Sequence, residues 1–147
     1  MKKFRFPLEA VARVRRQEVR QQELRLADTA RQQKEAEAQR DQARETLGQV
    51  LHEAPQADEV DASDFLHWDE RRTHALDSVE REEERLAQWA LRFEEDRVDL
   101  MKARKKEEAV DRLRDRRYAE FVLEVLREEQ AELDEFAGRE DQRRKAA

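Results

Sequence analysis

Several kinds of residue are scarce in this chain of 147 residues, and each scarcity limits what it can be. There is no cysteine, which excludes disulfide bonds and a thiol nucleophile. Two glycines and two prolines are too few for a compact domain of many short elements joined by turns. No stretch approaches the roughly 20 apolar residues of a membrane-spanning helix. Charges at Glu9 and Arg13 follow the basic N-terminus too soon for an apolar signal region, so we expect a cytoplasmic protein.

Charged residues are abundant instead, and a regular apolar stripe runs between them. They make up 46% of the chain, against 37% hydrophobic residues, which favours long helices over a globular core. Between residues 65 and 110, the stripe alternates spacings of three and four, and ten of its fourteen positions are apolar. Such a repeat is typical of a coiled-coil seam and argues against disorder. The fourteen seam positions are Phe65, Trp68, Arg72, Ala75, Val79, Glu82, Leu86, Trp89, Phe93, Asp96, Leu100, Ala103, Glu107 and Val110.

A first long helix is expected before the centre of the chain. Pro7 suits the first turn of a helix, where no amide donor is needed. The helical pattern then continues over residues 7–54, with a weaker apolar seam than the stripe above. Pro55 prevents simple continuation, so residues 55–63 are predicted to be the break.

A second, longer helix is expected after the break, over residues 64–137. Asp61 or Ser63 can cap its N-terminus, because both side chains carry an oxygen that accepts hydrogen bonds from the first turn. Gly138 is a plausible terminator, which leaves residues 138–147 as a polar tail.

The short break predicts an antiparallel hairpin rather than a parallel dimer. If the facing residue numbers add up to 118, the two apolar stripes match along their length, with Val50 beside Trp68 and Leu26 near Phe93. We therefore predict an all-α fold: two long helices in an antiparallel coiled-coil hairpin, forming a single elongated domain over residues 1–147, monomeric on its own.

This register leaves the C-terminal part of helix two without a partner. Residues 111–137 overhang helix one, and the apolar rhythm shifts there by a four-residue insertion. One side of the overhang is nevertheless apolar, so we expect either a partner or the N-terminal Phe4 and Phe6 to cover it. Its apolar residues are Tyr118, Phe121, Val122, Val125, Leu126, Leu133 and Phe136.

The sequence offers no convincing reactive or metal site. The carboxylates are expected on open helix surface, where nothing shifts their pKa or excludes water, so no catalytic residue, cofactor or metal is predicted. His67, Glu70 and His74 share one helix face but fit a solvated surface better than a metal site. The basic runs at residues 13–16 and 112–117 are interleaved with acids, which disfavours a nucleic-acid partner.

Charge is segregated along the chain, although the net charge is only -6. Residues 1–25 carry a net charge of +5 and residues 102–117 a net charge of +4, and together we name them the basic collar. Residues 45–70, which we name the tip, carry eight acidic side chains and no lysine or arginine before Arg71. Such patterning concerns partners and orientation more than fold.

Both ends of the chain resemble the FliJ family of flagellar type III export proteins. Residues 4–15 read Phe-Arg-Phe-Pro-Leu-Glu-Ala-Val-Ala-Arg-Val-Arg, and residues 133–137 read Leu-Asp-Glu-Phe-Ala. The resemblance covers essentially the whole chain. It implies a non-enzymatic coiled-coil hairpin, similar to the central stalk of rotary ATPases, that acts in flagellum biogenesis, protein transport and chemotaxis.

The resemblance also implies partners and a location. The expected partners are the export ATPase ring, the membrane export gate and export chaperones, with the protein peripherally associated with the inner membrane and not inserted in it. Two alternatives stay open within the coiled-coil reading: a scaffold of a virulence type III secretion system, and a self-associating structural rod. A nucleic-acid binder remains a third class, which salt-sensitive retention of DNA or RNA would indicate.

Two candidate binding surfaces follow from the resemblance and the apolar surplus. The acidic tip departs from the apolar surface expected of the family, and its apolar residues are candidates for a weak gate contact. The overhang, with the basic collar beside it, is the candidate for ATPase binding. Candidate gate-binding residues are Leu51, Phe65, Leu66 and Trp68. Candidate ATPase-binding residues are Phe4, Phe6, Leu113, Tyr118, Phe121, Val122, Val125, Leu133 and Phe136.

Overall fold

Two long helices make up most of the computed structural model, which describes residues 2–56 and 60–147. Helix α1 spans Glu9–His52 and helix α2 spans Ala62–Ala146, 44 and 85 residues respectively. The two helices pack against each other as a helical hairpin, and no strand occurs in the described residues. The predicted fold class is therefore confirmed. Residues 57–59, which belong to the predicted break and to the tip, lie outside the described residues.

The helix ends near the break follow from local hydrogen bonding. Helix α1 ends at His52, ahead of Pro55, which cannot continue a helix. The Gln49 carbonyl oxygen accepts a hydrogen bond from the Glu53 amide at 3.1 Å, and the Leu51 carbonyl oxygen accepts one from the Ala54 amide at 3.3 Å. Asp61 directly precedes α2, and its carbonyl oxygen accepts a hydrogen bond from the Phe65 amide at 3.2 Å.

The predicted helix end at Gly138 is wrong, because α2 continues to Ala146. A glycine ends a helix when it adopts a positive φ, and Gly138 does not. An i,i+4 ion pair between Arg139 and Glu135 spans Gly138, and a second one between Lys145 and Asp141 follows it. Such pairs, with basic residues in the last turn, stabilise a helix end. The predicted polar tail is thus helical.

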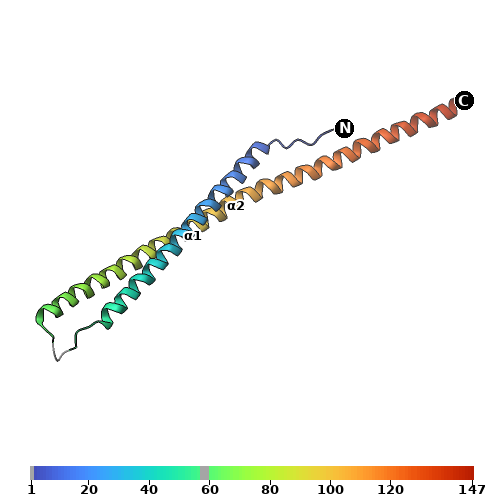
Figure 1. Ribbon diagram of the computed structural model, residues 1–147. Coiled ribbons are helices and arrows are strands. Elements are labelled where there is room, and N and C mark those ends of the chain that lie inside the picture. The colour runs from blue at the N-terminus through green and yellow to red at the C-terminus, as the bar shows by residue number, and fades with distance from the viewer. Residues whose placement is uncertain (1, 57–59) are drawn as a thin grey trace. The chain divides into compact units, whose positions relative to one another are not determined.

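The chain divides into two compact units, and both helices contribute to each. The smaller unit consists of residues 2–19 and 103–147, and the larger unit of residues 20–102. In the larger unit α1 and α2 run antiparallel, and Figure 1 shows the C-terminal end of α1, in teal, beside the beginning of α2, in green. Ala36 of α1 and Ala75 of α2 are buried between them.

The predicted seam is the face that the structure buries. Thirteen of the fourteen seam positions of α2 are buried or half-buried, and Phe65 alone among them is exposed. The buried positions carry mostly small side chains, and among the described residues no large side chain is fully buried. The seam therefore holds the hairpin together but encloses no large core, as expected of two helices.

A buried threonine contacts a half-buried aspartate in the part of the larger unit that is far from the loop. Thr29 is only 3% exposed, and its hydroxyl oxygen lies 2.6 Å from both the Arg25 carbonyl oxygen and Asp96 Oδ2. The hydroxyl has one hydrogen, so it donates to one of these two acceptors at a time. Because both side chains are short, this contact fixes which residues face each other.

The predicted register is wrong by about one heptad away from the loop. The numbers of paired residues add up to 124–127 for Thr29 with Asp96, Gln39 with Arg85, and Arg44 with Glu83, rather than to 118. A slip of seven residues keeps the same seam positions on the inner face, so the stripe pattern alone fits both registers. Polar contacts such as the Thr29 pair distinguish them. At the loop end, Trp68 does reach Val50, as predicted.

A double-mutant cycle on Thr29 and Asp96 tests this register. Thr29→Val should lower the free energy of unfolding by about 1–2 kcal/mol, because it leaves the half-buried Asp96 carboxylate without its partner. In an Asp96→Leu background the same change should cost close to nothing, since no polar group is then stranded. Urea unfolding measures all four proteins. In the register first predicted, Thr29 faces Trp89, and its cost would not depend on residue 96.

Candidate functional site

The N-terminal segment, which we define as residues 2–6, packs on α2 in the smaller unit. It is not helical, and Phe4 is its central contact. The Phe4 ring centroid lies 5.3 Å from that of Tyr118 at 79°, an edge-to-face pair, and 5.5 Å from that of Phe121 at 49°. Such pairs add about 0.5–1.5 kcal/mol beyond the area they bury. The prediction that Phe4 covers part of the apolar overhang is therefore confirmed.

Phe6 continues this contact toward the start of α1. Its side chain is 9% exposed and belongs to the small buried core. Phe6 lines a hollow together with Phe4, Leu113 and Phe121, which brings four candidate ATPase-binding residues together. The Phe6 carbonyl oxygen accepts a hydrogen bond from the Glu9 amide at 3.2 Å, where α1 begins. Phe6 and Leu113 thus belong to the packing of this unit.

An ion pair fastens the other end of the N-terminal segment. Lys2 Nζ donates a hydrogen bond to Glu128 Oε1. This hydrogen bond, the charge of Glu128 and the charge of Glu124 hold the pKa of Lys2 above its ordinary value of 10.5. A raised lysine pKa means that the contact contributes fully below pH 10.5 and is lost only as the pH rises through the higher value. Lys2 is therefore charged and docked at neutral pH.

The N-terminal segment explains the change of apolar rhythm in α2. Up to Arg114, which pairs with Glu9 at 3.2 Å, α2 faces helix α1 and keeps the heptad spacing. Beyond that residue the partner is an extended chain, which imposes no heptad. Half-buried positions resume at Phe121, Val125 and Glu128, where the segment lies.

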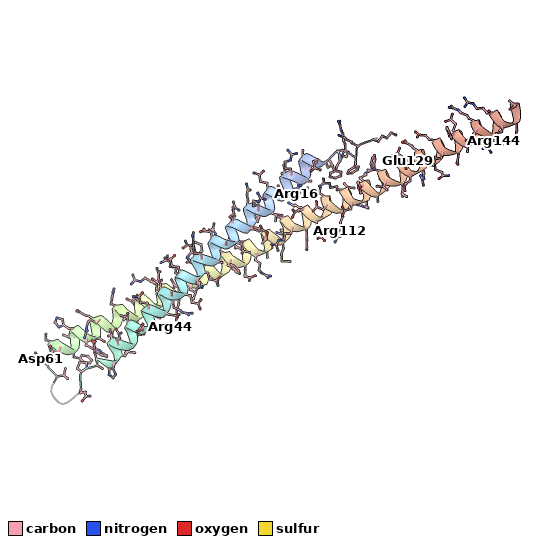
Figure 2. The ribbon with its side chains drawn as sticks, turned by 45° about the vertical axis from the view of Figure 1, so that its right-hand side comes forward. Arg16, Arg44, Asp61, Arg112, Glu129 and Arg144 are labelled. Carbon is pink, nitrogen blue, oxygen red and sulfur yellow. The ribbon has the colours of Figure 1, made fainter. Side chains whose placement is uncertain are left out.

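The last part of α2 has no intrachain cover. All residues from 129 to 147, which we name the free helix end, are exposed. Leu133 is 64% and Phe136 is 68% exposed, and their spacing of three places them on one side of the helix. Figure 2 shows this part, from Glu129 to Arg144, as a helix whose side chains project freely. Two candidate ATPase-binding residues therefore remain fully available.

The tip also presents apolar side chains to solvent. Leu51, Phe65 and Leu66 are exposed, although Phe65 was predicted to be the first position of the seam. Several acidic residues lie close to them in the sequence: Glu53, Asp61, Asp64, Asp69 and Glu70. Two of these are paired with arginines, Glu53 with Arg71 at 2.8 Å and Asp69 with Arg72 at 2.6 Å. Asp58 and Glu59 of the predicted acidic tip lie outside the described residues.

Trp68, the fourth candidate at the tip, has a structural contact instead. Its indole Nε1 donates a hydrogen bond to the Val50 carbonyl oxygen at 2.7 Å. This carbonyl is one of the last four of α1, and such carbonyls find no amide donor within their own helix. The Trp68 hydrogen bond therefore caps α1. The Trp68 ring also lies 5.7 Å from the Phe65 ring and 5.6 Å from the Arg72 guanidinium carbon. Trp68 and Phe65 thus help to hold the tip together.

Small side chains leave a hollow between the helices of the larger unit near the tip. Its volume is about 850 Å³, and Ala43, Thr46, Ala75 and Ser78 line it. His74 and Glu70 also reach it, but His67 instead contacts the Ser63 carbonyl oxygen at 2.7 Å. Within residues 2–56 and 60–147, no group of three or more His, Asp and Glu side chains is placed to hold a metal ion.

The described helices contain no segment long and apolar enough to cross a membrane. In the basic collar, Glu9 contacts Arg16 at 3.9 Å and Arg114 at 3.2 Å, so part of the collar's charge is neutralised within the smaller unit. Lys3, Arg5 and Arg13 are exposed and keep the positive charge of this region.

The structure thus divides the nine candidate ATPase-binding residues into four groups. Phe4, Tyr118 and Phe121 form the ring cluster, and Phe6 and Leu113 line the hollow next to it. The other four are Val122 and Val125, which line a second hollow beside Lys2, and the exposed Leu133 and Phe136.

Sequence reasoning missed the acidic row beside the ring cluster. Glu120, Glu124 and Glu128 lie four residues apart and therefore on one face of α2. The signal was present, because a spacing of four is visible in the sequence, but such charges are common on solvated helices. Only the docked Lys2 shows that this row faces a cation.

Comparison with known proteins identifies one family. No curated protein and no solved structure matches the chain. The family described as flagellar FliJ protein matches residues 4–146, which is nearly the whole chain and includes both helices and the N-terminal Phe4 and Phe6. The long helical hairpin and the motifs at both ends agree with this match. The chain therefore belongs to the flagellar FliJ protein family.

Proposed function

We propose that this protein is a non-enzymatic adaptor of flagellar protein export that binds the export ATPase through the smaller unit and the export gate through the tip. Membership of the FliJ family implies a role associated with flagellar export. The finer assignment to two partners rests on the two exposed apolar surfaces. A role in export-chaperone handover is proposed from the family resemblance alone.

The free helix end is the observation that carries the ATPase assignment. It is continuous helix as far as Ala146 and has no buried residue, and yet it presents Leu133 and Phe136. Burying such side chains in a partner contributes about 1.5–3 kcal/mol each. A helix that projects from a folded unit suits insertion between subunits of a ring, and the positive charges of Lys3, Arg5 and Arg13 in the same unit would orient its approach.

The tip supports the gate assignment by a different chemistry. Leu51 and Leu66 are exposed and take no part in the contacts that hold Trp68. The surrounding carboxylates repel acidic surfaces and favour a basic partner surface. A small apolar patch with an acidic rim suits a weak, transient contact, because little area is buried and the rim remains hydrated.

Titration with the export ATPase from the same organism tests the proposal. Sedimentation velocity of the labelled full-length chain should show a monomer alone and a fast-sedimenting complex when the ATPase is added. Addition of salt should weaken the complex, because part of the orientation is electrostatic. A stable dimer of the chain by itself would instead support the self-associating rod. Absence of any complex at micromolar concentrations, with full helix content, would contradict the proposed function.

A further inference from the structure

We infer that the acidic and apolar groove of α2 around Phe121, Val125, Glu124 and Glu128 is a binding site for an extended protein segment that carries a basic residue two positions before an aromatic residue. The chain's own N-terminal segment occupies this groove until a partner segment replaces it. The inference rests on the proposed function in that the export ATPase, which this unit binds, would supply that segment. The site's chemistry itself is read from the contacts of residues 2–6.

The N-terminal segment shows which chemistry the groove recognises. Lys2 pairs with Glu128, Phe4 packs on Tyr118 and Phe121, and Phe6 is buried. The intervening Lys3 and Arg5 are exposed and lie only at the edge of the hollow at Phe121. Side chains of an extended chain point alternately to opposite sides, so every second residue faces α2. The basic residue meets Glu128 and Glu124, and the aromatic residue meets Tyr118 and Phe121.

The N-terminal segment is held by its side chains. Among the described residues, no backbone hydrogen bond joins residues 2–6 to α2, and the bond from the Glu9 amide to the Phe6 carbonyl oxygen is internal to the start of α1. Lys2 is largely exposed, so water and salt weaken its ion pair with Glu128. Fixing the segment also costs conformational entropy at each residue. A segment of similar chemistry can therefore exchange with it.

The groove is longer than the part that the N-terminal segment covers. A hollow of about 530 Å³ adjoins Lys2, and Val122, Val125 and Leu126 supply its apolar lining. Glu129 and Glu132 extend the acidic row along it. A partner segment that continues in this direction would add apolar and basic contacts that residues 2–6 do not make. This surplus gives the partner the advantage needed to displace the N-terminal segment.

A peptide with the sequence of residues 2–8, Lys-Lys-Phe-Arg-Phe-Pro-Leu, is the direct probe. The full-length variant Lys2→Glu/Phe4→Ser should release the groove while leaving Phe6 in place. Fluorescence anisotropy should then show the labelled peptide binding the released variant at least about tenfold more tightly than the wild-type chain. A control peptide with serine at both phenylalanine positions should not bind.

Charge reversal in the groove completes the test. Glu124→Lys/Glu128→Lys, introduced into the released variant, should weaken peptide binding at least about tenfold, with helix content by circular dichroism unchanged. The inference is overturned if the released variant does not bind the peptide. It is also overturned if the released variant binds the serine control peptide equally well and charge reversal in the groove changes neither affinity. It is also overturned if the wild-type chain is a dimer that exchanges its N-terminal segments, because the cis occupant would then be absent.

A separate variant distinguishes this inference from the proposed function. Leu133→Ser/Phe136→Ser in the released background leaves every groove residue intact, so it should bind the peptide as the released variant does. Peptide binding without any ATPase binding by the wild-type chain would support the groove and refute the partner assignment. ATPase binding without peptide binding would support the proposed function and refute the groove as a binding site.

Discussion

Leu133→Ser/Phe136→Ser should weaken binding of the full-length chain to the export ATPase by at least about 100-fold. Both side chains are about two-thirds exposed, so no internal contact is lost. Two apolar side chains that become buried in a complex contribute about 3–6 kcal/mol together, and each 1.4 kcal/mol is a factor of ten in Kd. Isothermal titration calorimetry with the wild-type chain and the variant measures the difference.

The matched control is Leu24→Ser/Leu91→Ser in the larger unit. These leucines are 68% and 65% exposed, nearly the same as Leu133 and Phe136. The control should bind the ATPase like the wild-type chain, and both variants should unfold at the wild-type temperature. If the two double variants lose affinity equally, general surface hydrophobicity rather than the free helix end accounts for binding. If neither loses affinity, the free helix end is not the ATPase contact.

Leu51→Ser/Leu66→Ser should abolish detectable binding to the cytoplasmic part of the export gate. A transient contact has little affinity to spare, so loss of two apolar anchors takes it beyond measurable concentrations. These two positions are preferable to Phe65, because the Phe65 ring packs on Trp68, which caps α1. Surface plasmon resonance with immobilised gate fragment measures the loss.

Affinity for the ATPase provides the control for the tip variant. It should be unchanged, because Leu51 and Leu66 belong to the larger unit and the proposed ATPase contact to the smaller one. The Leu24→Ser/Leu91→Ser variant should again keep wild-type gate binding. Loss of both partners by the tip variant, with helix content intact, would argue against two separate surfaces.

The fold could be predicted from the sequence because the spacing of apolar residues identifies a coiled-coil seam. The stripe from Phe65 to Val110 predicted which side of α2 is buried, and the structure buries or half-buries every position of it except Phe65. Pro55 and Asp61 placed the break between the helices within a few residues. These features depend on local chemistry and on a repeat, both of which a single sequence displays.

The register was not predictable in the same way. A repeat of seven looks identical after a slip of seven, so only unique contacts such as Thr29 with Asp96 decide between the alternatives. The helix through Gly138 was missed for a related reason. A glycine near the end of a helical pattern can either end the helix or lie within it. Here the ion pairs of Arg139 with Glu135 and of Lys145 with Asp141 favour a helix that continues.

The candidate site was predicted in its residues but not in its arrangement. Sequence reasoning identified the apolar side of residues 118–136 and suggested that Phe4 and Phe6 cover it. It did not show that the covering stops at Glu128, which leaves Leu133 and Phe136 free. Sequence reasoning also assigned Trp68 to the candidate gate surface. In the structure the Trp68 indole donates a hydrogen bond to the Val50 carbonyl oxygen at the end of α1. Such contacts depend on where two distant segments meet.

The most direct measurement asks whether the chain joins the two partners. Labelled gate fragment should sediment with the export ATPase when the wild-type chain is present and not when it is omitted. Leu133→Ser/Phe136→Ser and Leu51→Ser/Leu66→Ser should each abolish this co-sedimentation, the first by losing the ATPase and the second by losing the gate. Co-sedimentation that is equally strong without the chain, or a chain that binds either partner but never both, would contradict the adaptor function.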